Sequence, residues 1–127
     1  MKSIITCLAL CATAYAPVAQ AADCTTLQEY YGEWSAAQQA LLDFDYTGKQ
    51  SEAQSQYQSC INNIWRIYGS SGSDAAAQAA RDCEDEYNYA LDNIEMEYGP
   101  LHNEEISTGL YYNWYLGQTL AEGLQCF

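Results

Sequence analysis

Apolar residues recur every three or four positions along most of the chain, which is the spacing of one face of an α-helix. The first such stretch begins at Thr26, which forms a capping-box pattern with Glu29, and it runs to about Phe44. The second runs from a cap at Ser51 to Gly69. No alternating pattern typical of a strand competes with either stretch.

Two more helical stretches follow a flexible Ser/Gly segment. Ser73 is placed to cap the third, and Gly99 followed by Pro100 is expected to end it. Asn103 is placed to cap the fourth, whose expected inner stripe is Ile106, Leu110, Trp114, Ala121 and Leu124. Because short connections favour antiparallel neighbours, the sequence predicts an all-α fold, an up-down-up-down four-helix bundle.

Four cysteines lie beyond the N-terminal segment: Cys24, Cys60, Cys83 and Cys126. At 1.5 Å per residue, Cys60 and Cys83 lie about 12 Å and 13.5 Å from the turn between the second and third helices, level on facing stripes. Cys24 and Cys126 lie at the start and end of the bundle. We therefore expect the disulfides Cys60–Cys83 and Cys24–Cys126, each stabilising by roughly 3–5 kcal/mol. Zinc is disfavoured because no C-x-x-C pair is present.

Residues 1–21 have the features of a secretory signal peptide. Lys2 provides the positive start, residues 4–16 are apolar, and Ala19 and Ala21 are small residues suited to cleavage. The apolar run is shorter than the roughly 20 residues of a membrane span. We expect cleavage near Ala21, which would leave one acidic helical domain over residues 22–127, secreted or periplasmic and without membrane insertion. The even cysteine count agrees with an oxidising compartment. Bacterial and eukaryotic origins both stay open.

Charge narrows the range of partners. The full chain has 17 acidic and 4 basic residues. Cleavage would remove Lys2 and leave a net charge of −14. Such a surface repels phosphate backbones and anionic lipids, so we expect no nucleic-acid or membrane-surface role. It attracts cationic proteins, peptides or metal ions, although the charge could serve solubility alone.

Catalytic motifs are absent from the sequence. His102, the single histidine, is expected in the loop before the fourth helix. The chain has no Glu-x-x-His, C-x-x-C-H or G-x-S-x-G pattern, and paired cysteines offer no nucleophile. We therefore predict that the protein is not an enzyme and holds no resident cofactor. An enzyme that uses His102, for example in a Ser–His pair, is the competing alternative.

One segment resembles a calcium-binding EF-hand loop. Its candidate ligands are Asp43, Asp45, Thr47 and the Lys49 carbonyl, at the first, third, fifth and seventh places. Gly48 occupies the sixth place, where the loop bends, but Gln54 stands where a bidentate Glu is required. Weak calcium binding and an acidic interhelical turn are the two alternatives.

Aromatic residues suggest a surface for a protein partner. With the inner stripe above, Tyr111, Tyr112, Tyr115 and Leu116 fall on the flank and far side of the fourth helix. Rigid exposed tyrosines are suited to protein recognition. The alternative is that neighbouring helices cover part of them. The sequence therefore predicts a small exported interaction protein, such as an acidic inhibitor, immunity or adaptor protein for a basic partner. A weak calcium-binding helical module using residues 43–54 is the alternative.

Overall fold

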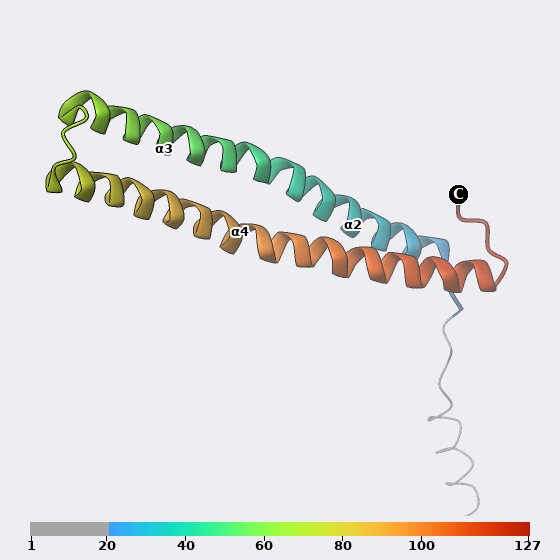
Figure 1. Cartoon of the computed structure of the whole chain (residues 1–127). Helices are drawn as coiled ribbons and strands as arrows, with labels where there is room; N and C mark the ends of the chain where they lie inside the picture. The colour runs from blue at the N-terminus through green and yellow to red at the C-terminus, as the bar shows by residue number, and fades with distance from the viewer. Residues whose placement is uncertain (1–20) are drawn as a thin grey trace, which may run out of the picture.

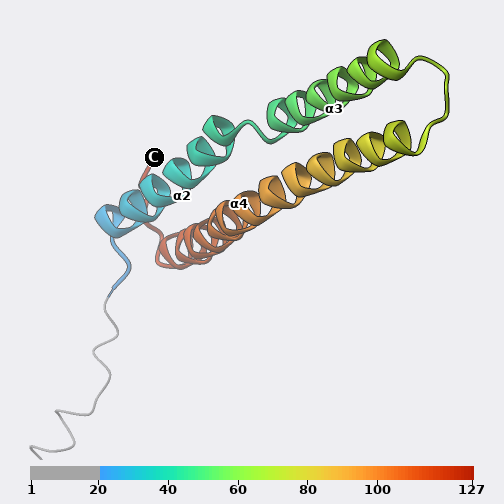
Figure 2. The same ribbon diagram turned by 90° about the vertical axis from the view of Figure 1, so that its left-hand side faces the viewer.

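The computed structural model describes residues 21–127 as a long helical hairpin (Figures 1 and 2). Helices α2 (Cys24–Phe44) and α3 (Tyr46–Tyr68) follow one another end to end and form the first arm. Helix α4 (Asp74–Ala121) forms the whole second arm, antiparallel to the first. The chain reverses once, after α3, so the start of α2 and the C-terminus lie at the same end. All but the last residue of the predicted signal peptide lies outside the described residues.

The all-helical class is confirmed, since residues 21–127 contain helices and connecting segments but no strand. The up-down-up-down four-helix arrangement is not confirmed, because the described part of the chain has three helices in two arms. Two local features account for the difference. The break between α2 and α3 does not reverse the chain, and Gly99 followed by Pro100 does not end a helix.

The break in the first arm is a single residue, Asp45. Its backbone is left-handed (φ 51°, ψ 59°), and its N–H donates to Leu42 O at 3.2 Å, which ends α2. Its side-chain Oδ1 accepts from Gly48 N at 3.2 Å, so the same residue caps α3. The helix therefore restarts at once in nearly its former direction, visible as a narrow gap in Figure 2. The predicted cap at Ser51 lies inside α3.

Helix α4 continues through Pro100 without ending. A proline inside a helix loses one N–H donor and crowds the preceding turn, at a cost of about 3 kcal/mol. Packing around it opposes this cost. The Tyr98 ring lies 4.4 Å from Tyr46 and 6.2 Å from Phe44, and it stacks on His102 at 5.3 Å (centroid distances). Side chains on both sides of Pro100 thus contact the first arm or one another, and the predicted cap at Asn103 lies mid-helix.

Two other helix starts are set by side-chain caps. Ser73 caps α4, as predicted, with Oγ accepting from Ala76 N at 3.2 Å. Helix α2 begins earlier than predicted because Asp23 is the cap instead of Thr26. The Asp23 carboxylate accepts from Thr26 N at 2.7 Å and from Thr26 Oγ1 at 2.9 Å. The bond from the Thr26 backbone lowers the pKa of the Asp23 carboxyl.

Both predicted disulfides are formed. Cys24 joins Cys126 with a Cα–Cα distance of 5.2 Å, and Cys60 joins Cys83 at 5.9 Å. The same cysteine pairs are expected for a four-helix bundle and for the observed two-arm hairpin, for a geometric reason. Any even number of antiparallel arms returns the C-terminus to the starting end, and the hairpin that contains Cys60 and Cys83 is common to both arrangements. One disulfide therefore closes the terminal end, and the other ties the arms near the turn.

The buried core is thin, because two arms meet along a single line. Its buried apolar side chains are Ala22, Leu27, Ala37, Ala53, Cys83 and Ile94. Two threonines of α4 are also buried, and each hydroxyl donates to a carbonyl of its own helix. The distances are 2.8 Å from Thr108 Oγ1 to Glu104 O and 2.8 Å from Thr119 Oγ1 to Leu116 O. Small side chains along α4 thus allow the arms to approach closely.

The closest such approach lies at Gly109. A Cβ added there would be 2.9 Å from Trp34 Nε1, so the indole occupies the space of a missing side chain. Trp34 Nε1 also donates to Glu105 Oε1 at 3.0 Å, and the ring stacks on Tyr112 with a centroid distance of 5.2 Å. Gly117 differs, since a Cβ added there would meet nothing within 4 Å.

This contrast predicts opposite effects of two identical substitutions. Gly109→Ala should lower the free energy of unfolding by about 1–3 kcal/mol, because the added methyl group overpacks Trp34. Gly117→Ala should raise it by about 0.5–1 kcal/mol, because alanine is the better helix former. Urea unfolding with both disulfides intact measures the two values. An equal gain at both positions would contradict the close approach at Gly109.

Candidate functional site

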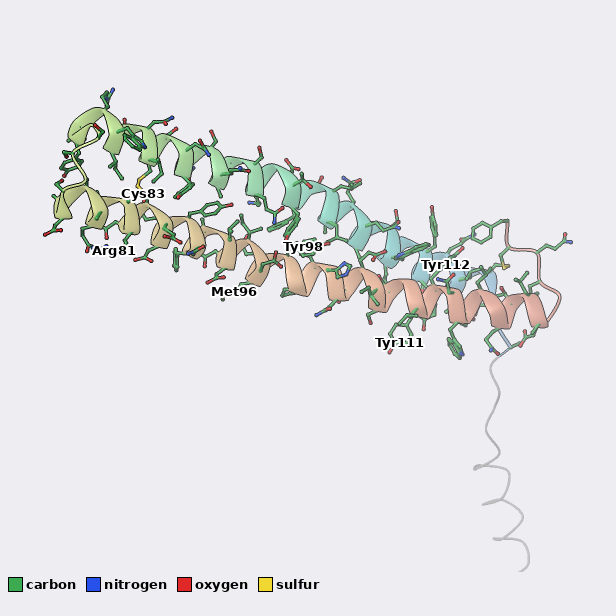
Figure 3. The ribbon with its side chains drawn as sticks, in the orientation of Figure 1. Arg81, Cys83, Met96, Tyr98, Tyr111 and Tyr112 are labelled. Carbon is green, nitrogen blue, oxygen red and sulfur yellow. A yellow bond between two sulfur atoms is a disulfide. The ribbon has the colours of Figure 1, made fainter. Side chains whose placement is uncertain are left out.

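Three of the four predicted partner-binding residues, Tyr111, Tyr112 and Tyr115, contact side chains of the first arm. Tyr112 stacks on Trp34 of α2 and points toward the first arm in Figure 3. Tyr115 packs edge-on against Tyr30 at 5.3 Å between centroids, and its hydroxyl accepts from Asp23 N at 2.9 Å. Leu116 is also half-buried. Tyr111 also stacks on Tyr30 of α2, at 6.3 Å between centroids, although 58 % of its surface stays exposed. The three tyrosines therefore hold α2 to α4.

The residues that we expected inside this part of α4 lie outside. Leu110 and Trp114 are 66 % and 60 % exposed, and Ile106 is 45 % exposed. Two sets of residues in this segment have helical spacing and could form the inner stripe. Because we expected a helix to end at Pro100, the sequence analysis chose the wrong set. In a continuous helix the inner stripe continues by steps of three or four from Ile94 and Tyr98, through Leu101, Glu105, Thr108, Tyr112, Tyr115 and Thr119. The small residues Thr108 and Gly109 were the signal for it.

The outer face of α4 carries the largest set of exposed apolar side chains on one side of a described helix. We define it by Tyr89, Met96, Ile106, Leu110 and Trp114, which expose 45–73 % of their surfaces. In Figure 3, Met96 points away from the first arm, whereas Tyr98 and Tyr112 point toward it. An open hollow on this face is lined by Ser107, Leu110, Tyr111 and Trp114. Exposed apolar side chains gathered on one side of a helix in this way are typical of interaction sites.

Acidic side chains surround the outer face. The exposed acids of the same helix between the Cys83 disulfide and Leu110 include Glu84, Asp85, Glu86, Asp92, Glu97 and Glu104, with Asp82 just before them. Glu95 differs, because it accepts a hydrogen bond from the Tyr46 hydroxyl of α3. The basic side chains of the described chain are engaged with neutral groups. Arg81 donates to Gln78 at 2.9 Å, Arg66 to Asn63 at 3.1 Å, and Lys49 Nζ lies 4.9 Å from the Phe44 ring centroid. The negative potential of α4 is therefore available to a partner.

The predicted calcium ligands are not arranged as a loop. Asp43 is in the last turn of α2, whereas Thr47 and Lys49 belong to α3. Asp43 Oδ1 accepts from Gln39 at 2.8 Å, and Asp45 caps α3 through Gly48. Within residues 21–127, no three His, Cys, Asp or Glu side chains converge as a metal site. A helical backbone at the seventh place directs its carbonyl along the helix axis and away from a central ion.

Gly48 has a different role from the one its place in the motif suggests. A Cβ added at this position would overlap the Asp45 carboxylate. Glycine is therefore required for the cap to lie against the first turn of α3. The Asp-x-x-Gly spacing that resembles a calcium loop is explained here by helix capping.

His102 lies within α4, and not in a loop as predicted. Its ring stacks on Tyr98, and its Nδ1 is buried with no hydrogen-bond partner among the described residues. Its recorded ring contact is with Tyr98, which itself lies against Tyr46 of the first arm.

Comparison with known proteins does not indicate a function, so the outer face of α4 is the main structural evidence for one. The chain matches no family model, no curated protein and no solved structure. A search of the described helices finds none with the length and apolar character needed to cross a membrane.

The cap at Asp45 predicts an interaction between two substitutions. Gly48→Ala in the wild-type chain should give no gain, or lose up to about 1 kcal/mol, because the methyl group displaces the capping carboxylate. In an Asp45→Gly background, which keeps the left-handed backbone but has no carboxylate, the same change should gain about 1 kcal/mol. Urea unfolding of the four proteins measures the difference. The same gain in both backgrounds would contradict the capping contact.

Calcium should have no specific effect on stability. We expect about 5 mM calcium chloride to change the Tm of residues 22–127 no more than magnesium chloride at the same concentration, because the ligands do not converge. Both salts screen the acidic surface equally, so magnesium is the control for charge. A calcium-specific rise in Tm that Asp43→Asn abolishes would support the calcium-binding module instead.

Proposed function

We propose that this protein is a small exported interaction protein, not an enzyme, that binds a basic protein partner as an acidic inhibitor, immunity or adaptor protein. The single observation that carries the proposal is the outer face of α4, where exposed aromatic and aliphatic side chains lie among uncompensated acids. Each part of this surface has a distinct role in binding.

The acids would act before contact is made. A surface of one sign accelerates the encounter with a partner of opposite sign and selects against partners of the same sign. Exposed charge alone provides little affinity, since it stays solvated at the rim of an interface. Acidic side chains on α4 therefore favour basic partners without by themselves holding them.

The apolar side chains would supply the affinity. Binding energy in protein interfaces concentrates in a few buried residues, among which Trp and Tyr are enriched. Trp114 and Leu110 border the hollow on the outer face, and both are more than half exposed in the free chain. Burying them would remove apolar surface from water at a small cost in side-chain entropy.

Export is the remaining part of the proposal. Both disulfides suit an oxidising compartment, such as the periplasm or the extracellular medium. Together with the signal-peptide features of residues 1–21, they support a secreted or periplasmic protein. A basic partner would then be an exported protein or a peptide that reaches the same compartment.

The proposal predicts which partners are recovered from the native secreted fraction. Immobilised residues 22–127 should retain proteins of high isoelectric point, and sodium chloride at about 0.5 M should release most of them, because salt screens the charge attraction. A triple variant of α4, Asp82→Asn/Asp85→Asn/Asp92→Asn, should retain markedly less. The triple variant Glu29→Gln/Glu33→Gln/Glu52→Gln, on the first arm, is the matched control. Partners without a basic bias, held equally by all three proteins, would contradict the proposal.

A further inference from the structure

We propose that the outer face of α4 binds one basic, amphipathic α-helix supplied by the protein partner. This inference rests on the proposed function and adds to it the surface and the shape and charge of what is bound. It also replaces the tyrosine surface that the sequence suggested, because Tyr112 and Tyr115 are occupied between the arms.

The spacing of the apolar side chains indicates a helical partner. Tyr89, Met96 and Leu110 are separated by seven and fourteen residues. At 100° per residue they fall, with Trp114, within an arc of about 60° on α4. Asp92 and Asn103 occupy other positions of this stripe, so it is a straight line of apolar and polar side chains along one side of α4. We call this line the seam, and its direction along the helix suits a second helix packed beside α4.

The seam has the dimensions of a helix contact. Between residues 89 and 114 it is about 37 Å long, at 1.5 Å per residue, which a partner helix of roughly 25 residues would cover. The first arm packs on the opposite side of α4, so nothing in the described chain covers the seam (Figures 1 and 3). A third helix laid on it would give α4 a second packed face.

Charge along the seam indicates that the partner helix is basic over one half. Asp92 lies within the seam, and Asp82 and Asp85 lie on the same side of α4 about one to two turns before Tyr89. The acidic side chains on this side therefore gather at the N-terminal end of the seam. Leu110 and Trp114 lie toward the C-terminal half. A complementary helix has Lys or Arg over the acidic half and large apolar side chains over the other.

This distribution argues against a second copy of the chain as the occupant. Parallel pairing of two outer faces would set Asp85 and Asp92 against their own copies. Antiparallel pairing would set them against Leu110 and Trp114 and remove their carboxylates from water without a partner charge. The net charge of −14 over residues 22–127 opposes both arrangements.

A synthetic peptide tests the inference directly. The probe is a 25-residue helical peptide with lysines on one face of its first half and leucines on the same face of its second half. Its control is a peptide of the same composition, reordered so that no face is apolar. Titration calorimetry against disulfide-intact residues 22–127 should show one-to-one binding of the probe, at least tenfold tighter than that of the control peptide.

Two pairs of variants locate the binding surface. Leu110→Ser/Trp114→Ser should weaken probe binding at least tenfold, whereas Leu42→Ser/Ile67→Ser should change it less than twofold. The second pair removes apolar side chains of the first arm that are as exposed, at 72 % and 69 %. Asp82→Asn/Asp85→Asn/Asp92→Asn should likewise cost at least tenfold, and the Glu29, Glu33 and Glu52 triple less than threefold. Circular dichroism melts confirm that each variant is folded.

The outcomes separate this inference from the proposed function. If basic proteins still bind but the outer-face variants bind the probe as tightly as the wild type, the inference is overturned and the proposed function stands. If neither the probe nor a basic protein binds at about 20 mM sodium chloride, both fail. Sedimentation showing a wild-type dimer that Leu110→Ser/Trp114→Ser converts to a monomer would make the face a contact between two copies, which also overturns the inference.

Discussion

The two disulfides are the constraint on which the rest of this structure depends. Two helical arms meet along one line and bury few large side chains, of which Leu27 is the only apolar one wholly inaccessible in the described chain. Helices in proteins are stabilised mainly by packing of an apolar face. A contact this thin along a 48-residue helix would therefore hold the two arms together only weakly. Cys24–Cys126 and Cys60–Cys83 restrict the unfolded chain instead, and they hold the arms together near both ends.

Because disulfides tie the arms near both ends, the rest of the surface does not need residues that stabilise the contact between the arms. Acids that repel one another along α4 lower stability, yet the chain has few bases, and these contact neutral groups. Because the arms are covalently tied, this repulsion need not be offset by ion pairs. The two-arm arrangement also leaves the outer face of α4 without a packing partner. Exposed apolar and acidic side chains therefore occur together on one helix. That combination is what a basic helix would recognise.

Close contacts within the hairpin depend on small residues opposite large ones. Trp34 lies over Gly109, and the Asp45 carboxylate lies over Gly48. In each case glycine is present because a neighbouring side chain occupies the space of its Cβ. Aromatic rings between the arms then fill the contact, and most of the tyrosines of this chain that seemed free for a partner stabilise the fold.

The sequence by itself determined the helical class, the cap at Ser73 and both disulfide pairs, because these follow from periodicity and from the level of each cysteine along an antiparallel hairpin. Only the tertiary structure decided that Pro100 lies inside a helix and that Asp45 interrupts an arm without reversing it. Gly99 followed by Pro100 shows that continuing the helix costs free energy. The contacts of Tyr98 with Phe44 and Tyr46 oppose that cost. Once α4 is continuous, its phase is set by Ile94 and Tyr98, and Leu110 and Trp114 turn outward. The candidate site therefore depended on one helix boundary, which long-range packing decides and short sequence patterns do not.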